Sequence, residues 1–207
     1  LLGAVPWVLA REPAGHYHAC VTSPPYWGLR DYGLAPSDWP ALEYAPMAGL
    51  PPVAVPAMRC ALGLEPTPEA YIGHLVLVFR AVRRVLREDG VLWLNLGDSY
   101  AANRDKQVTP TKWKSPKQGQ PSSVPWGLKP KDLVGIPWRA AFALQADGWY
   151  LRSDVIWAKP NPMPESVSDR PTKAHEYLFV LTKSPRYFWD AEAVRERAVK
   201  GAAGSDF

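Results

Sequence analysis

The feature that most constrains the fold is a helix followed at once by an apolar strand. Thr67, Pro68 and Glu69 are typical of a helix start, with a capping hydroxyl, a proline in the first turn and a favourable acidic charge. Apolar residues at three- and four-residue spacing then form a stripe, namely Ile72, Leu75, Phe79, Val82 and Leu86. We expect Asp89-Gly90 to end this helix and residues 91–96 to form a buried strand. Because another apolar segment, 18–22, precedes the helix, the order strand–helix–strand predicts a parallel sheet and an α/β fold.

The loop after the first strand carries an unusual set of groups. It reads Ser23-Pro24-Pro25-Tyr26, and its two prolines have a fixed φ and no backbone N–H. The carbonyls of Ser23 and Pro24 are therefore kept out of a sheet ladder and free to accept hydrogen bonds from a ligand. Carbonyl acceptors, a hydroxyl and an aromatic ring together suit a flat ring that bears an amino group, such as a nucleobase.

A second polar loop, Gly97-Asp98-Ser99-Tyr100, follows the 91–96 strand. Ligands of open α/β sheets bind at the carboxyl ends of the strands, where the Ser23–Tyr26 loop also emerges. The two loops therefore predict one site at this edge. A helix-capping or turn role is the alternative for Asp98.

The second half of the chain predicts further elements of the same fold. We expect a helix over residues 137–144 and two strands, 150–159 and 176–182, which pair as a hairpin at the sheet edge. Residues 191–199 have a helical pattern. The Pro-rich segment 34–66 is expected to be an irregular lid or a loop facing substrate, and 101–131 a flexible basic loop whose lysines could contact phosphates.

Composition narrows the functional classes only modestly. The net charge of +4 is compatible with a polyanionic partner but does not require one. Cys20 and Cys60 form no disulfide framework, and His16, His18 and His74 show no metal-ligand spacing with a cysteine or an acid, so no metal is expected. No apolar run reaches the ~20 residues of a membrane span and no secretory signal is visible, so we expect a cytoplasmic protein.

Four ordered blocks give the chain a family resemblance. They are VTSPPYWGLRDYG (21–33), LGLEPTPEAY with RRVLREDGVLWLNLGDSYA (within 62–101), LVGIPWRAAFALQADGWYLRSDVIWAKPNPMPES (133–166) and DRPTKAHEYLFVLTKSPRYFWDAEAVRE (169–196). The chain resembles bacterial and phage site-specific DNA methyltransferases that modify exocyclic amino groups, in the motif order that places the Ser-Pro-Pro-Tyr loop first. The resemblance implies a Rossmann-like sheet, doubly wound and mostly parallel with an antiparallel hairpin.

The resemblance also implies roles for particular residues. The catalytic loop is Ser23, Pro24, Pro25 and Tyr26: Tyr26 stacks on a base flipped out of double-stranded DNA, while the Ser23 side chain and the Pro24 carbonyl accept hydrogen bonds from its amino group. The cofactor is S-adenosylmethionine, for which Thr22, Asn95 and Asp98 are candidate contacts. The candidate DNA contacts are Trp27, Arg30, Lys106, Lys112, Trp113, Lys114 and Lys117. A cognate restriction endonuclease is a further expected partner.

One family motif has no counterpart in this chain. The family's Gly-rich cofactor loop is absent, and relatives usually have Gly-Asp where this chain has Gly3-Ala4, so we expect 1–207 to be a partial catalytic domain truncated at both ends. Ser rather than Asp before Pro-Pro-Tyr favours cytosine N4 as the acceptor, with adenine N6 as the alternative. Two further hypotheses are a non-catalytic DNA-binding remnant and an enzyme that methylates amino groups of protein or RNA.

Overall fold

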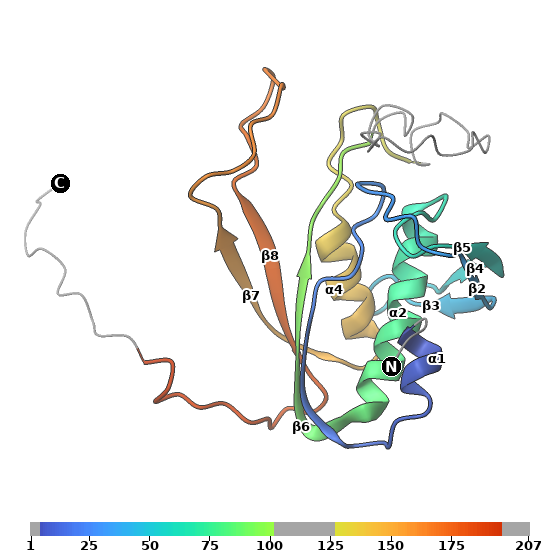
Figure 1. Ribbon diagram of the computed structural model, residues 1–207, viewed down its shortest axis with the longest axis vertical. Helices are drawn as coiled ribbons and strands as arrows, with labels where there is room; N and C mark the ends of the chain where they lie inside the picture. Colours follow the sequence, from blue (N-terminus) through green and yellow to red (C-terminus); the bar gives the residue numbers. More distant parts are fainter. Residues whose placement is uncertain (1–4, 102–126, 196–207) are drawn as a thin grey trace, which may run out of the picture.

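The largest sheet has four strands, and the two polar loops leave it at one edge. The computed structural model describes residues 5–101 and 127–195 (Figure 1). The strand order is β1-β6-β8-β7, formed by β1 (Tyr17–Thr22), β6 (Leu86–Leu96), β8 (His175–Thr182) and β7 (Tyr150–Ala158). The pairing of β1 with β6 is parallel, whereas β8 is antiparallel to both β6 and β7. Three strands therefore run in one direction and β8 runs against them, which confirms the predicted α/β sheet and its antiparallel hairpin.

Three helices pack together on the sheet. They are α1 (Val5–Leu9), α2 (Pro68–Val85) and α4 (Ile136–Ala146), and all three lie on one side of the sheet in Figure 1. The doubly wound prediction expected helices on both faces, and the described residues supply only this one layer. Most side chains of β1 and β7 are accordingly exposed.

The core lies between α2, α4 and the central strands. The predicted stripe of α2 is buried as expected, and its cap is confirmed, because the Thr67 hydroxyl accepts a hydrogen bond from the backbone N–H of Ala70 at 3.1 Å. The largest fully buried side chains include Tyr71, Phe79, Leu92, Leu94 and Phe179. Burial of this apolar area is the main favourable contribution to folding, and it fixes the helices against β6 and β8.

The segment 34–66 is not irregular, which corrects the sequence prediction. It forms a hairpin of two short ladders that contacts α2, in which β2 (Ser37–Trp39) pairs with β5 (Met58–Cys60) and β3 (Leu42–Tyr44) with β4 (Val53–Val55). Both ladders share one register, so Pro40 lies opposite Ala57 and Ala41 opposite Pro56. Because proline has no N–H to donate, Pro40 and Pro56 interrupt the hydrogen bonding of a single hairpin at neighbouring positions and divide it into two ladders.

Two further boundaries differ from the expectations. The helix α2 ends at Val85, and β6 begins directly at Leu86, so Asp89 and Gly90 lie inside the strand. The fully buried Leu86 pairs with Tyr17 of β1, but the next paired residue of β6 is Val91, opposite Ala19. Residues 87–90 therefore form an irregularity in the ladder at the place where the sequence predicted a turn. Residues 191–194 form turns instead of the start of a helix. Among the described residues, each helix is too short or too polar to cross a membrane.

Candidate active site at the carboxyl edge of the sheet

The Ser-Pro-Pro-Tyr loop follows β1, and hydrogen bonds from α2 and from the segment before it stabilise the loop. Pro24 is buried, and the carbonyl of Pro25 accepts a hydrogen bond from the Tyr71 hydroxyl of α2 at 2.8 Å. A few residues on, the N–H of Gly28 donates to the carbonyl of Gly63 at 2.9 Å. The loop is therefore held by α2 and by the segment that precedes this helix.

Tyr26 lies directly over the backbone that follows β6. A Cβ atom added at Gly97 would stand 2.4 Å from two carbons of the Tyr26 ring. Such a distance is far inside van der Waals contact, so only glycine lets the ring lie this close to the chain. Gly97 thus brings the two loops into contact, as their common position at the edge predicted.

The Tyr26 hydroxyl is the centre of a hydrogen-bond network. It lies 2.6 Å from Oδ1 of Asn95 and 3.2 Å from Oε2 of Glu176. The Ser23 hydroxyl donates to the Tyr26 oxygen at 3.2 Å and approaches Asn95 Oδ1 at 3.4 Å. Asn95 is itself oriented, because its Nδ2 donates to the carbonyl of Tyr177 at 3.1 Å. Groups from β1, β6 and β8 therefore meet at one point.

Glu176 is an ionised carboxylate at this point. Partial burial raises the pKa of its carboxyl group, but the hydrogen bond and charge of Lys159, together with hydrogen bonds from Asn95 and Tyr26, outweigh burial and leave the pKa lowered. Lys159 reaches the other oxygen, Oε1, across the β7–β8 hairpin. The pKa of Tyr26 is raised to about 12, first by burial and further by the negative charge of Glu176, while the Ser23 hydrogen bond opposes the rise. Tyr26 is thus a neutral phenol at physiological pH.

Asp98 connects the β6 loop to α4. Its Oδ1 accepts hydrogen bonds from the backbone N–H groups of Ser99, Gly135 and Ile136, at 2.9, 3.0 and 2.9 Å. The capping alternative is therefore present in the structure. The cofactor role of Asp98, like those of Thr22 and Asn95, stays a prediction.

The predicted DNA contacts fall into three groups. Trp27 is a correction: it is 3% exposed and its indole N–H donates to the carbonyl of Glu65 at 3.0 Å, so it is a core side chain and does not face DNA. Arg30 is exposed, with its guanidinium 5.7 Å from the centre of the Tyr32 ring, and its role stays a prediction. The remaining candidates lie outside the described residues, namely Lys106, Lys112, Trp113, Lys114 and Lys117.

His74 gains partners that its sequence spacing did not suggest. Its Nδ1 lies 2.9 Å from Oε1 of Glu65, and both side chains are fully buried. Cys60 brings a third potential metal ligand within 4.8 Å of this pair. Both Glu65 oxygens are already engaged, since Oε2 accepts the N–H of Gly63 at 2.8 Å. The His74–Glu65 contact thus joins α2 to the segment before it, and Nε2 of His74 is buried with no hydrogen-bond partner among the described residues.

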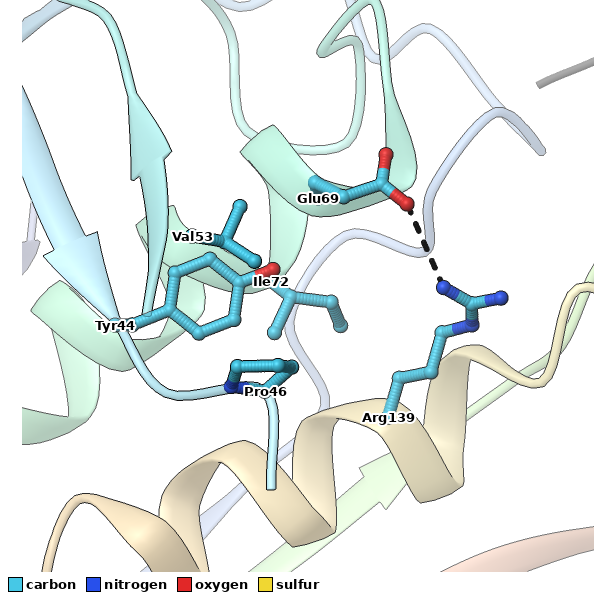
Figure 2. Close-up of a pocket in the computed structure, with 6 residues that line it drawn as sticks. All are labelled: Tyr44, Pro46, Val53, Glu69, Ile72 and Arg139. Atoms are coloured by element: carbon cyan, nitrogen blue, oxygen red, sulfur yellow. Dashed lines mark hydrogen bonds and ion pairs between the residues drawn. The ribbon is translucent and has the colours of Figure 1, made fainter. Parts of the chain in front are cut away.

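A separate shallow pocket lies between the β3–β4 ladder, α2 and α4. Its lining consists of Tyr44, Pro46, Val53, Glu69, Ile72 and Arg139 (Figure 2). An ion pair of 3.5 Å between Glu69 and Arg139 closes one side. None of the residues predicted for catalysis or cofactor binding lines it.

The sequence analysis did not identify Lys159 and Glu176 as residues of the site. It also did not predict that the Tyr26 ring packs against Gly97. Glu176 follows His175 at the start of β8, where an acidic side chain is not by itself a signal of a site. Only the β7–β8 register brings Lys159 and Glu176 together, because β8 runs antiparallel and its first residues lie at the same edge as the last residues of β6. Two oppositely charged residues on either side of the segment that connects the predicted hairpin strands were the available signal.

A mixed α/β sheet with polar loops at its carboxyl edge is a Rossmann-like arrangement, and solved methyltransferases share it. The chain superposes with a TM-score of 0.54 and 20% identity on a Thermus thermophilus protein described as a DNA modification methylase and solved with S-adenosyl-L-methionine, covering 93% of this chain and 56% of that one. The PvuII cytosine-N4-specific DNA methyltransferase gives a TM-score of 0.51 at 13% identity, over 90% of this chain and 49% of that one. At these identities the likeness establishes the fold.

The sequence itself establishes the family. The DNA methylase family model matches residues 17–203, and the chain belongs to this family. It is 48% identical over 196 residues to the type II methyltransferase M.Cfr9I of Citrobacter freundii, covering 94% of this chain and 57% of the relative. It is 47% identical over 186 residues to M.SmaI of Serratia marcescens, covering 88% of this chain and 54% of the relative. The chain thus spans little more than half the length of these relatives.

Proposed function

We propose that this chain carries the base-binding part of an S-adenosylmethionine-dependent enzyme that methylates an exocyclic amino group in DNA. The observation that carries the proposal is the Tyr26 ring seated on Gly97, with its hydroxyl held by Asn95 and Glu176 beside the Ser23 hydroxyl. A neutral, fixed aromatic ring next to hydrogen-bond acceptors suits a flipped base that bears an amino group. Membership of the DNA methylase family supports the same activity.

The residues of the loop take distinct roles in this proposal. Tyr26 stacks on the base, and the Ser23 oxygen and the Pro24 carbonyl accept the two amino hydrogens. These hydrogen bonds draw the nitrogen lone pair out of conjugation with the ring, so that it can attack a methyl carbon in line. The N–C bond would form as the bond from that carbon to its sulfur breaks, and the nitrogen would release one proton to solvent. S-Adenosylmethionine supplies that methyl group as an electrophile when bound. Loop preorganisation by Tyr71 and the hydrogen bond from Gly28 to Gly63 lowers the cost of orienting the base.

The cofactor assignment rests on the position of the site and on a relative. The solved Thermus thermophilus protein contains S-adenosyl-L-methionine, and this chain shares its fold. Thr22 lies at the end of β1, and Asn95 and Asp98 lie at the end of β6, which is the edge where ligands of α/β sheets bind. Oδ1 of Asn95 and Oδ1 of Asp98 already accept hydrogen bonds within the protein. We therefore propose that these two residues line the cofactor site and shape it. The Gly-rich loop that the family uses for its main contacts is not in this chain.

Cytosine N4 is the acceptor that we favour, with adenine N6 as the alternative. Ser23 stands where an aspartate would favour adenine. The PvuII enzyme, named as cytosine-N4-specific, shares the fold over 90% of this chain and supports the same choice.

The wider partners are part of the same proposal. Arg30 is exposed and close to the loop in sequence, and we assign it a contact to a DNA phosphate. Residues 34–66 and 101–131 are insertions of the catalytic domain, and the five basic and aromatic candidates in the second would contact DNA. The names of the type II relatives support a cognate restriction endonuclease of the same specificity.

Methyl transfer from tritiated S-adenosylmethionine to mixed-sequence plasmid tests this function. The protein is the longest reading frame that contains this chain, with Tyr26→Ala as the test variant. Tyr17→Ala is the matched control, because Tyr17 lies at the other end of β1. We expect label with the parent and the control and none with Tyr26→Ala, and digestion to nucleosides then separates methylcytosine from methyladenine. DNA binding without label in the parent would favour the non-catalytic reading, and label on RNA or protein alone would overturn the DNA substrate.

A further inference from the structure

We propose that Glu176, held by Lys159, is the positioning residue that fixes the Tyr26 ring for base stacking. The inference rests on the proposed function and adds two residues to its site. Three groups converge on the Tyr26 hydroxyl. The Tyr26 oxygen lies 2.6 Å from Oδ1 of Asn95 and 3.2 Å from Oε2 of Glu176, which share its single proton, and it accepts a hydrogen bond from the Ser23 hydroxyl at 3.2 Å. A hydroxyl surrounded in this way cannot swing sideways without losing partners.

The ring is held at its other end by shape. Gly97 lies beneath the ring edge, where any Cβ would come within 2.4 Å of two ring carbons. The backbone therefore blocks movement toward β6, while the hydroxyl contacts oppose movement away from it. Asn95 and Glu176 come from neighbouring strands, so the ring is attached to both β6 and β8. A misplacement of about 1 Å at a reacting centre can cost on the order of 100-fold in rate, which makes such a double anchor useful.

Lys159 gives Glu176 its orientation. The backbone N–H of Lys159 donates to the carbonyl of Ala174 at 2.8 Å, which extends the β7–β8 pairing by one step and places the lysine beside Glu176. The ammonium group binds Oε1 and leaves Oε2 for Tyr26. The Glu176 side chain is 19% exposed and that of Lys159 is 41% exposed, so the contact to Tyr26 lies on the protected side of the ion pair. A charged acceptor makes a stronger hydrogen bond than a neutral one at equal distance, so Glu176 can share the single phenol proton although Asn95 lies closer.

A double-mutant cycle with Tyr26→Phe and Glu176→Gln tests whether Glu176 acts through the hydroxyl. Tyr26→Phe keeps the stacking ring and removes the hydroxyl, and Glu176→Gln keeps the shape and removes the charge. We expect each single variant to lower kcat by about three- to tenfold with KM for S-adenosylmethionine unchanged, and the double variant to lose no more than Tyr26→Phe alone. Multiplied losses, or a Glu176→Gln enzyme as active as the parent, would overturn the proposal. Glu192→Gln, at an exposed ion pair with Arg195, is the matched control.

A second measurement needs no methyl transfer. The protein is labelled with 3-fluorotyrosine, and the ¹⁹F resonance of Tyr26 is identified by its loss in Tyr26→Phe. Glu176→Gln and Lys159→Met should both shift this resonance, whereas Lys159→Arg should restore the parent position. If the Tyr26 resonance does not shift in Glu176→Gln, Glu176 does not position the Tyr26 ring. Because the readout reports the contact itself, a protein that fails to methylate DNA but shows the shift would contradict the proposed function and leave the Tyr26 anchor standing.

Discussion

At the scale of single residues, the site depends on one glycine as much as on the polar groups. Tyr26 can lie across the β6 loop only because position 97 has no Cβ. Its hydroxyl then reaches Asn95 and Glu176, whose positions are set by two neighbouring strands. The absence of a side chain at Gly97 and the hydrogen bonds of the Tyr26 hydroxyl together determine the position of the Tyr26 ring.

Gly97→Ala should impair activity more than stability. The new Cβ would meet the Tyr26 ring at 2.4 Å, so the ring must move, and we expect roughly a 10- to 100-fold lower kcat/KM. The measurement is methyl transfer beside thermal unfolding. Gly73→Ala is the control, because its Cβ would crowd the Val55 side chain at 2.9 Å, away from the loop, and should lower stability without changing the rate of the folded protein. A Gly97→Ala enzyme with the parent rate would show that the position of the Tyr26 ring does not require glycine at position 97.

At the scale of elements, backbone hydrogen bonds at helix ends and proline positions decide the local structure. Asp98 leaves β6 and satisfies the first N–H groups of α4, which otherwise have no partner within the helix. In the hairpin, Pro40 and Pro56 break one ladder into two without changing its register. The first feature joins two elements that are 37 residues or more apart in the chain, and the second keeps a Pro-rich segment ordered.

Asp98→Ala should therefore destabilise the protein. Losing an acceptor for three backbone N–H groups leaves partly buried donors unpaired, and we expect a loss of about 1–3 kcal/mol in the free energy of unfolding. Asp98→Asn retains an oxygen in the same place and should lose less. Urea unfolding of both variants measures the difference. Equal stability of the alanine variant and the parent would show that the cap contributes little.

At the scale of the whole molecule, the described residues form one helical layer against a mixed sheet. The helices α2 and α4 are joined at their C-terminal ends by Arg80 and Asp147, whose shortest contact is 2.6 Å. Further ion pairs are spread over the surface, and the lowered pKa values of several carboxyl groups make stability depend on pH. In each of these groups the charged form is favoured by folding.

Stability should fall on acidification. The hydrogen bond from Arg87 lowers the pKa of Asp89, that from Lys131 lowers the pKa of Asp169, and Lys159 outweighs burial to lower that of Glu176. A lowered folded-state pKa means that the contribution is fully present above the ordinary values of 3.8 for Asp and 4.5 for Glu, and is lost as pH falls through the lowered values. Urea unfolding should thus give a constant free energy near neutral pH and a decline below about pH 5. Asp169→Asn should flatten part of that decline, and 0.5 M salt should weaken it, since the Debye length is then only about 4 Å. A free energy of unfolding that rises on acidification would contradict this account.

The sequence determined the local elements and the chemistry of the loop, because their signals are local. The Thr67 cap, the apolar stripe of α2, the β7–β8 hairpin and the Ser23–Tyr26 loop all follow from neighbouring residues, and the four sequence blocks carry the family. Only the tertiary structure decided that Trp27 is buried, that β6 begins at Leu86 and that the 34–66 segment is a hairpin. It also brought Lys159 and Glu176 to Tyr26. These features depend on strand register and on contacts between distant segments, where burial and long-range hydrogen bonds outweigh local preference.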